Sequence, residues 1–307
     1  MIYLDNNATT PVAPEARDAM LPWLGDEFGN PSSLCASGRR ARKAVDRARE
    51  QVAGLIHASP EEIVFTGCGT ESNNAAIHSA LSTQPGKTHI VTSAVEHSAI
   101  LDYLRALERR GAATFTLVGV DALGRLDLEA LAAALRPETA LVSIIWANNE
   151  TGIVSPIGEA AGIAADYGVP FHTVAVNAAA KLELDVRAHP LHFLSLGGHK
   201  FHAPKGVGAL FVKSGLRFEP LLIGGGQENG RRSGTEAVPA LMGLGAAAEL
   251  GAAFVGSGGT GAIRTLRDRL EARLVEAIEG IVITGDQSDP EARLSNTSHL
   301  SIEGVRA

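Results

Sequence analysis

The chain has 307 residues, of which 45% are hydrophobic and 20% are charged, as in an ordinary globular protein. Its 27 Lys and Arg residues against 34 Asp and Glu residues give a net charge of -7, which excludes a basic nucleic-acid-binding surface as its main feature. No apolar run approaches the roughly 18 residues of a membrane span, and the N-terminus lacks a signal-peptide pattern. Two cysteines are too few for a disulfide scaffold. We therefore expect a cytoplasmic protein without a nucleic-acid, membrane or metal site.

The hydrophobic pattern predicts alternating strands and helices. A short strand is expected at residues 2–4, helices at 14–24 and 36–56, and a strand at 63–66 that leads into a helix ending near residue 81. Strands at 89–93, 114–118, 140–146 and 170–174 then alternate with helices at 98–110, 128–135 and 157–167. Continuous apolar strands separated by helices are typical of a largely parallel sheet that is covered on both faces.

The C-terminal third is more irregular. Strands are expected at residues 193–196 and 208–212, a helix at 235–250, a flexible glycine-rich connection at 251–261, a helix at 262–279 and a strand at 281–284. This order predicts a large α/β domain over residues 12–250. Residues 1–11 and 251–307 would form a smaller α+β domain, which we expect to be incomplete.

The loop after the strand at residues 193–196 carries the strongest chemical signal. Two glycines there precede His199 and Lys200. A lysine presented at a strand end beside a histidine can be desolvated, so that its pKa falls and its amine can attack a carbonyl. Taken alone, this stretch is also compatible with a Lys200 that is an ordinary solvated loop lysine and has no chemical role.

A second signal lies at the turn before the helix that ends near residue 81. Gly69 and Thr70 follow a strand and open a helix, where free amides and the helix dipole favour an anion such as a phosphate. Thr70, His97, Asn149 and Lys200 all follow predicted strands. Ligands of parallel sheets bind beyond the carboxyl ends of the strands, so we expect these residues to lie near one another.

Seven motifs in chain order carry a resemblance to a known family: DNNATTP (5–11), GNPSS (29–33), GTESNN (69–74), VEHSAI (95–100), ANNETG (147–152), LSLGGHKFHAPKGVG (194–208) and GRRSGTE (230–236). Together they resemble the cysteine desulfurases of the class V aminotransferase group, which use pyridoxal 5′-phosphate (PLP). The resemblance runs along the whole chain. It implies a fold-type I PLP-dependent transferase, with a mostly parallel sheet sandwiched by helices.

The resemblance also implies roles for individual residues. Lys200 would attach PLP covalently and later carry the substrate proton, and His97 would stack over the PLP ring and assist protonation. Asn149 would lie near the ring hydroxyl and the substrate, and Asn177 would approach the ring oxygen. The phosphate would be bound by Gly69, Thr70, His199 and Thr235, where Thr235 reaches it from the second subunit in family dimers.

The implied reaction mobilises sulfur from L-cysteine and releases L-alanine. In the family, a cysteine thiolate accepts the sulfur as a persulfide, and the sulfur serves iron–sulfur cluster or thio-cofactor assembly through an acceptor or scaffold protein. The resemblance thus implies a sulfurtransferase that forms a homodimer.

Several positions depart from the family pattern. Val174 stands where the family has an aspartate facing the pyridine nitrogen, Asn177 replaces a glutamine and Gly197 replaces a phosphate-binding serine. Val174 cannot accept the hydrogen bond of the charged ring nitrogen, which is worth about 1.5–3 kcal/mol. Its loss predicts a reaction at least tenfold to a hundredfold slower than in relatives with the aspartate. The family's persulfide-forming cysteine and its carboxylate-binding arginine lie C-terminal to the last residue, Ala307.

These departures leave alternatives open. A non-catalytic PLP-fold scaffold or dimer partner, another class V aminotransferase, a selenocysteine lyase and a fragment of a longer protein are all compatible with the sequence. Of the two cysteines, Cys68 precedes a helix N-terminus, where a thiol pKa can fall. Cys35 is expected to be a small buried thiol.

Overall fold

The computed structural model describes residues 2–305 and is centred on a seven-stranded sheet. The strand order is β1-β7-β6-β5-β4-β2-β3. Neighbouring strands from β3 to β6 are parallel, whereas β7 is antiparallel to both of its neighbours, so the predicted largely parallel sheet is confirmed. The strands are β1 (Ile63–Thr66), β2 (His89–Ser93), β3 (Thr114–Val118), β4 (Thr139–Ile145), β5 (Phe171–Val174), β6 (Phe193–Gly197) and β7 (Gly208–Val212).

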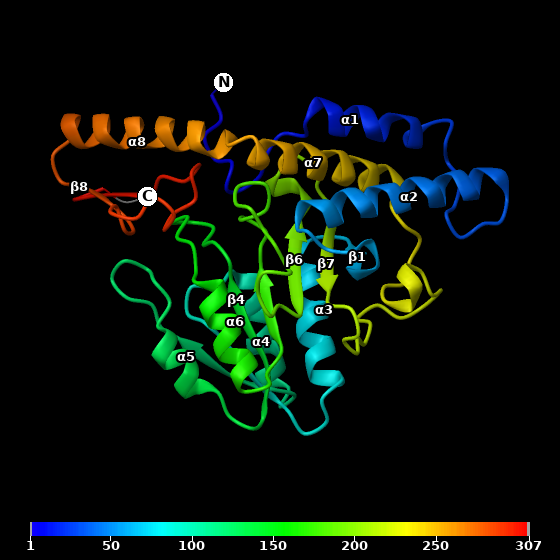
Figure 1. Ribbon diagram of the computed structural model, residues 1–307, viewed down its shortest axis with the longest axis horizontal. Coiled ribbons are helices and arrows are strands. Elements are labelled where there is room, and N and C mark those ends of the chain that lie inside the picture. Colours follow the sequence, from blue (N-terminus) through cyan, green and yellow to red (C-terminus); the bar gives the residue numbers. More distant parts are fainter. Residues whose placement is uncertain (1, 306–307) are drawn as a thin grey trace.

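The part of the chain that is described contains eight α-helices, of which α8 lies away from the seven-stranded sheet, beside the C-terminal segment (Figure 1). Most of them begin and end within three residues of the predicted positions. The helices are α1 (Pro14–Met20), α2 (Ala36–Leu55), α3 (Gly69–Ser82), α4 (Ser98–Arg109), α5 (Leu128–Ala134), α6 (Ile157–Asp166), α7 (Val238–Gly256) and α8 (Gly259–Ala277). Short 3₁₀ turns add η1 (Leu21–Leu24), η2 (Pro60–Glu62), η3 (Gly198–Lys200) and η4 (Glu228–Gly230).

The two faces of the sheet bury separate apolar clusters. Successive strand side chains point to opposite faces, so that in β1 Ile63 and Phe65 pack toward α2, α6 and α7, while Val64 packs toward α3 and α4. Every residue of β2, β4, β5, β6 and β7 is buried. This burial on both faces explains why most residues of these strands, taken together, are apolar.

The stretch between α7 and α8 corrects one prediction. Residues 251–261 were expected to be a flexible connection, but α7 continues to Gly256 and α8 begins at Gly259. Gly258, with a φ of 76°, makes the break between the two helices. A left-handed residue of this kind is where a glycine ends a helix without strain.

Helix α7 also corrects the expectation about apolar runs. Residues Val238–Gly256 are long and apolar enough to cross a membrane by length and composition alone. In the structure this helix packs along α1 and α2 (Figure 1), with Leu241 and Leu244 buried in the core. Buried core helices can meet the same criteria of length and composition as membrane-spanning helices.

The C-terminal region lies under α8. Strands β8 (Ile281–Ile283) and β9 (Leu300–Ile302) form a separate antiparallel pair, of which only β8 was predicted. The strand expected at residues 2–4 is wrong, because Ile2 and Leu4 lie in an exposed segment that pairs with no strand among residues 2–305. The domain boundaries at residues 11 and 251 stay a prediction.

Candidate active site

Three predicted site residues meet at the carboxyl edge of the sheet. His97 follows β2, Asn149 follows β4 and Lys200 ends the 3₁₀ turn after β6, and all three line one cavity of about 570 Å³. His97 caps α4 by accepting a hydrogen bond from the Ala99 amide at Nδ1, at 3.0 Å. A neutral ring therefore carries its proton on Nε2, where it can act as a donor.

Lys200 has the surroundings of a reactive amine. Its side chain is half-buried, and its Nζ donates a hydrogen bond to the backbone carbonyl of Asn7. Burial lowers the pKa of Lys200, while the carboxylates of Asp5 and Glu150 act in the opposite direction. A lowered pKa increases the fraction of neutral amine that can attack a carbonyl.

Other cationic groups gather around Lys200. Lys181 donates to the Asn177 carbonyl at 3.0 Å, and burial, followed by the charge of Lys200, lowers the Lys181 pKa to about 7. Burial also lowers the pKa of His199, and the charges of Lys200, Lys205 and Lys181 lower it further. Lysine and histidine side chains gathered in this way form a region in which a bound anion would be stabilised.

The start of α3 packs closely against this region. A side-chain carbon at Gly69 would lie 2.8 Å from Val176 Cγ2, and one at Gly197 would lie 3.1 Å from Val176 Cγ1. Both glycines are therefore needed for the close approach of α3, β6 and the loop after β5. Thr70 is exposed in the first turn of the 14-residue helix α3, where amides are free to bind an anion. Neither Gly69 nor Thr70 lines the 570 Å³ cavity.

Asn177 and Val174 present opposite chemistry. Asn177 is 5% exposed, and its Oδ1 has no hydrogen-bond partner among residues 2–305. Val174 is 3% exposed and packs in the apolar cluster with Ile145, its partner in the β4–β5 pairing. Asn177 thus offers an unused acceptor, whereas Val174 offers no polar atom.

Thr235 is separated from the other predicted residues. It lines a second, smaller cavity of about 160 Å³ together with Gly67, Glu228 and Arg232. Arg232 is held by Glu71, whose Oε2 also accepts from the Gly67 amide at 2.7 Å. Thr235 is therefore exposed beside the β1–α3 turn and does not line the cavity of Lys200.

The sequence analysis gave no role to several residues of the site. The main cavity is also lined by an N-terminal segment, by the neighbour of Asn149 and by a C-terminal segment: Leu4, Asp5, Asn6, Asn7 and Ala8, then Glu150, then Asn296, Thr297 and Ser298. Most of the N-terminal residues belong to the DNNATTP motif, which was the sequence signal that could have placed them at the site. The C-terminal residues reach the site through tertiary contacts, so that no local pattern predicted them.

Glu96 is a further missed residue, next to His97. Its Oε1 accepts from Ser93 Oγ at 2.8 Å and from the Ile145 amide at 2.6 Å, while its Oε2 is buried and, within residues 2–305, unpartnered. Burial raises the pKa of Glu96 to about 8, and the hydrogen bonds only partly oppose this. Glu96 is thus largely protonated near neutral pH, and it joins the ends of β2 and β4 beneath His97.

The structure contradicts the prediction made for Cys35. Both Cys35 and Cys68 are exposed, so the expectation of a buried Cys35 is wrong. Cys35 precedes α2, and a hydrogen bond with the Ser37 hydroxyl at 3.2 Å lowers the pKa of its thiol. Neither cysteine lines the main cavity. Within the described part of the chain, no group of three His, Cys, Asp or Glu residues is placed to hold a metal ion.

Comparison with known proteins identifies the family. The Aminotransferase class-V profile matches residues 2–307. The chain belongs to this family. It is 50% identical over 305 residues to a curated cysteine desulfurase of Gluconacetobacter diazotrophicus, covering 99% of this chain and 75% of that protein. It is 47% identical to cysteine desulfurase NifS of Azotobacter vinelandii over 99% of this chain and 75% of that protein.

Solved structures agree with this assignment. A NifS-like protein superimposes with a TM-score of 0.94 at 34% identity, covering 99% of this chain and 82% of that one. SspA in complex with cysteine superimposes with a TM-score of 0.78 at 40% identity, covering 81% of this chain and 72% of that one. The fold is therefore the predicted fold-type I architecture.

Members of this family depend on PLP, and the residues present fit most of its groups. The amine of Lys200 suits the aldehyde, the cationic groups of Lys181 and His199 suit the phosphate, and the orphaned Asn177 Oδ1 suits the ring hydroxyl. The position of Val174 does not fit, because a buried valine cannot accept a hydrogen bond from a protonated ring nitrogen.

Proposed function

We propose that this protein is a PLP-dependent cysteine desulfurase that takes sulfur from L-cysteine and releases L-alanine. The observation that carries the proposal is Lys200, a half-buried amine of lowered pKa in the same cavity as His97 and Asn149. The high identity to curated cysteine desulfurases supports the substrate. The solved structure of SspA in complex with cysteine also supports cysteine as the substrate.

PLP, when bound, supplies an electron sink for the bond-breaking step. Lys200 would hold it through the amine and, once released, would carry a proton to and from the substrate α-carbon. His97 would present its Nε2 proton over the cofactor, since its Nδ1 is engaged at the α4 N-terminus. Asn149 would contact the substrate, and its amide already donates to Glu150 Oε1 at 2.6 Å.

Charge balance supports phosphate binding at the other end of the site. Burial lowers the pKa values of Lys181, Lys200 and His199, and the charge of Lys200 lowers those of Lys181 and His199 further. A phosphate dianion would relieve this repulsion, and the free amides at Gly69 and Thr70 would add hydrogen bonds. We further propose that Thr235 reaches a phosphate in the second subunit of a homodimer, because in its own subunit it opens onto a separate cavity.

The cellular context is part of the proposal. We also propose that the sulfur serves iron–sulfur cluster assembly through an acceptor or scaffold protein, and that the protein is cytoplasmic. The NifS name of a relative supports the assembly role alone. Within this chain, Cys35 and Cys68 lie outside the main cavity, so an added thiol is the appropriate sulfur acceptor in a first assay.

The test is alanine formation from L-cysteine by the PLP-loaded chain with dithiothreitol as the sulfur acceptor. We expect one alanine for each sulfide released, and no alanine from the Lys200→Ala variant. A chain that binds PLP through Lys200 but forms no alanine, even over many hours, would contradict the desulfurase function. Ketone formation from another amino acid would instead indicate an aminotransferase.

A further inference from the structure

The loop that follows β4 is closed by the side chain of Asn148. Its Oδ1 accepts from the amides of Glu150 and Thr151, both at 2.9 Å, and from Thr151 Oγ1 at 3.1 Å. An asparagine whose side-chain oxygen accepts from amides two and three residues ahead forms an Asx-turn. Asn149 lies between Asn148 and Glu150, so it is held inside this turn.

The other polar atom of the Asn148 side chain reaches out of the loop. Asn148 Nδ2 donates to the Val95 carbonyl at 3.0 Å, two residues before His97. This bond joins the segment after β2 to the loop after β4. Exchange of the oxygen and nitrogen would place an acceptor against the Val95 carbonyl and donors against the turn amides, so the contacts define one orientation of the side chain.

A second contact joins the same two segments. Glu96 Oε1 accepts from the Ile145 amide at 2.6 Å, at the end of β4, and from Ser93 Oγ at 2.8 Å, at the end of β2. Val95 and Glu96 are thus both tied to the β4 side directly before His97. Because the His97 side chain is exposed, its position depends on the backbone that these two contacts hold.

The loop itself has little freedom to move. The Asn148 amide donates to the Ile153 carbonyl at 2.9 Å, and the Gly152 amide donates to the Asn148 carbonyl at 3.0 Å. Gly152 has a φ of 75°, and a side-chain carbon there would lie 2.6 Å from Thr297 Cβ. Glycine is therefore required at this position both by the backbone conformation and by the close contact.

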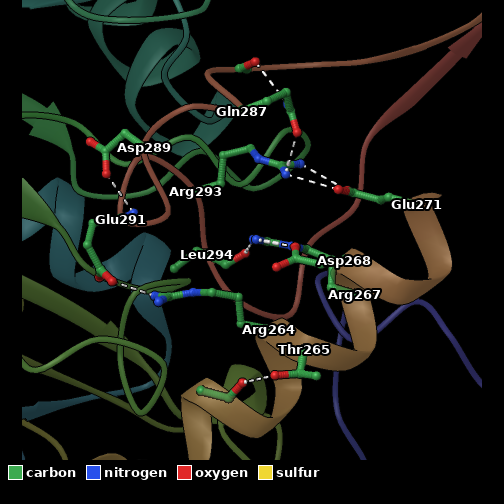
Figure 2. Close-up of polar contacts among 12 residues, drawn as sticks. Arg264, Thr265, Arg267, Asp268, Glu271, Gln287, Asp289, Glu291, Arg293 and Leu294 are labelled. Carbon is green, nitrogen blue, oxygen red and sulfur yellow. Dashed lines mark hydrogen bonds and ion pairs between the residues drawn. The ribbon is translucent and has the colours of Figure 1, made fainter.

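The C-terminal segment braces this loop. The Leu294 amide donates to the Gly152 carbonyl at 2.8 Å. Figure 2 shows the Leu294 carbonyl accepting from Arg267 at 2.8 Å, and the neighbouring Arg293 in a two-point ion pair with Glu271 at 2.9 and 3.0 Å. Both side chains of that pair are 4% exposed. A buried two-point ion pair is costly to desolvate, but it fixes a single arrangement of the chain, so the loop is a firm support.

We propose that Asn148 is a positioning residue, which fixes His97 relative to Asn149 by joining the segment that carries one to the loop that carries the other. This inference rests on the proposed function, because it takes His97 to lie over bound PLP. Asn148 does not line the main cavity, so it acts through its neighbours and not on the cofactor. Loss of its amide should therefore loosen His97 without removing a group that contacts PLP.

The test separates the two halves of the Asn148 side chain. Asn148→Asp and Asn148→Ser keep an acceptor for the turn amides, but both lose the amide group that donates to the Val95 carbonyl. The aspartate adds a charge and the serine does not. Gln84→Glu is the matched control, because Gln84 Nε2 donates to the Ala140 carbonyl at 2.8 Å, at the opposite end of β4 from Ile145.

PLP is titrated into each protein, and its dissociation constant is read from the cofactor absorption band, in the wild-type and His97→Ala backgrounds. We expect both Asn148 variants to bind PLP about fivefold more weakly in the wild-type background, as the loss of one aromatic stacking contact allows. Their absorption band should shift in the same direction as that of His97→Ala. In the His97→Ala background the same substitutions should change the affinity less than twofold, since changes that act through one contact are not additive. Gln84→Glu should stay within twofold of its parent in both backgrounds.

Equal losses of affinity in the two backgrounds would overturn the inference, because Asn148 would then not act through His97. Wild-type affinity in both Asn148 variants, or a loss in the aspartate variant alone, would also overturn it. If His97→Ala itself binds PLP as wild type does, the proposed place of His97 over the cofactor is wrong, and this inference with it. The readouts need no turnover, so a PLP-loaded chain that forms no alanine would contradict the desulfurase function alone.

Discussion

Two buried polar clusters of the molecule differ in how completely they are paired. Glu228 accepts from Arg49 at 2.6 and 2.7 Å and from the Phe65 amide at 2.8 Å, so both of its carboxylate oxygens are engaged. In the main cavity, by contrast, Asn296 Oδ1 and Ser298 Oγ have no partner in the described chain. The fully paired cluster fastens the loop at Glu228 to α2 and β1, whereas the incompletely paired one lies in the wall of an open cavity. Complete pairing of a buried charge predicts that its loss will be costly to stability.

The largest expected effect comes from breaking the paired cluster. Glu228→Gln keeps the shape of the side chain but leaves the charge of Arg49 buried without a counter-charge. Removal of one partner of a buried ion pair costs about 3–5 kcal/mol. Urea unfolding should show this loss in the free energy of unfolding. Arg47→Ala, which breaks exposed pairs, is the matched control and should cost less than about 1 kcal/mol. Equal losses in the two variants would contradict the comparison.

A second change concerns the position that does not fit PLP. Val174→Asp supplies a hydrogen-bond acceptor for the ring nitrogen of PLP. A hydrogen bond to a charged group is worth about 1.5–3 kcal/mol, so we expect the rate of alanine release to rise tenfold to a hundredfold. Without PLP the same variant should be less stable, because a carboxylate replaces a valine in an apolar cluster.

Val174→Asn is the control for this experiment, since it is polar but cannot carry a charge. Alanine release should be faster in the aspartate variant than in the asparagine variant. Equal rates in the two variants and in wild type would show that the ring nitrogen needs no charged partner in this protein.

A pH-dependent effect is expected from Glu96, whose pKa is raised to about 8 by burial. Between pH of about 4.5 and 8 the unfolded chain loses this proton while the folded chain keeps it, so stability falls as pH rises. One proton gives a slope of at most about 1.4 kcal/mol per pH unit. Glu96→Gln removes this contribution, so that the difference in unfolding free energy between wild type and variant should change steadily from pH 5 to pH 8. A constant difference would place the Glu96 pKa near its ordinary value.

The smallest effect concerns the exposed Cys35. The Ser37 hydroxyl, and then the Gly38 amide, lower the pKa of its thiol. Ser37→Ala should raise that pKa, so the pH profile of Cys35 alkylation, measured in a Cys68→Ser background, should shift to higher pH. An unchanged profile would mean that the hydroxyl does not stabilise the thiolate.

Much of the fold could be predicted because local pattern and burial agree. Strands β1 and β2 begin and end at the predicted residues, since each contains a short buried run with adjacent Ile and Val. The expected loop at residues 251–261 failed because α7 packs on α1 and α2, which compensates for its glycines. At the site, Lys200 and His97 follow strands and could be found in this way. Asn296 and Thr297 could not, because they reach the cavity through contacts with Asn7, about 290 positions away in the sequence.

The most direct measurement is to map where PLP is fixed by borohydride reduction. Two lysines of lowered pKa lie close together, Lys200 in the main cavity and Lys181 beside it. After reduction and proteolysis, mass spectrometry should find the pyridoxyl group on the peptide that contains Lys200, and Lys181→Met should retain it there. The Lys200→Ala variant should carry none. A pyridoxyl group on Lys181, or on neither lysine at saturating PLP, would contradict the assignment of Lys200 as the reactive amine of this protein.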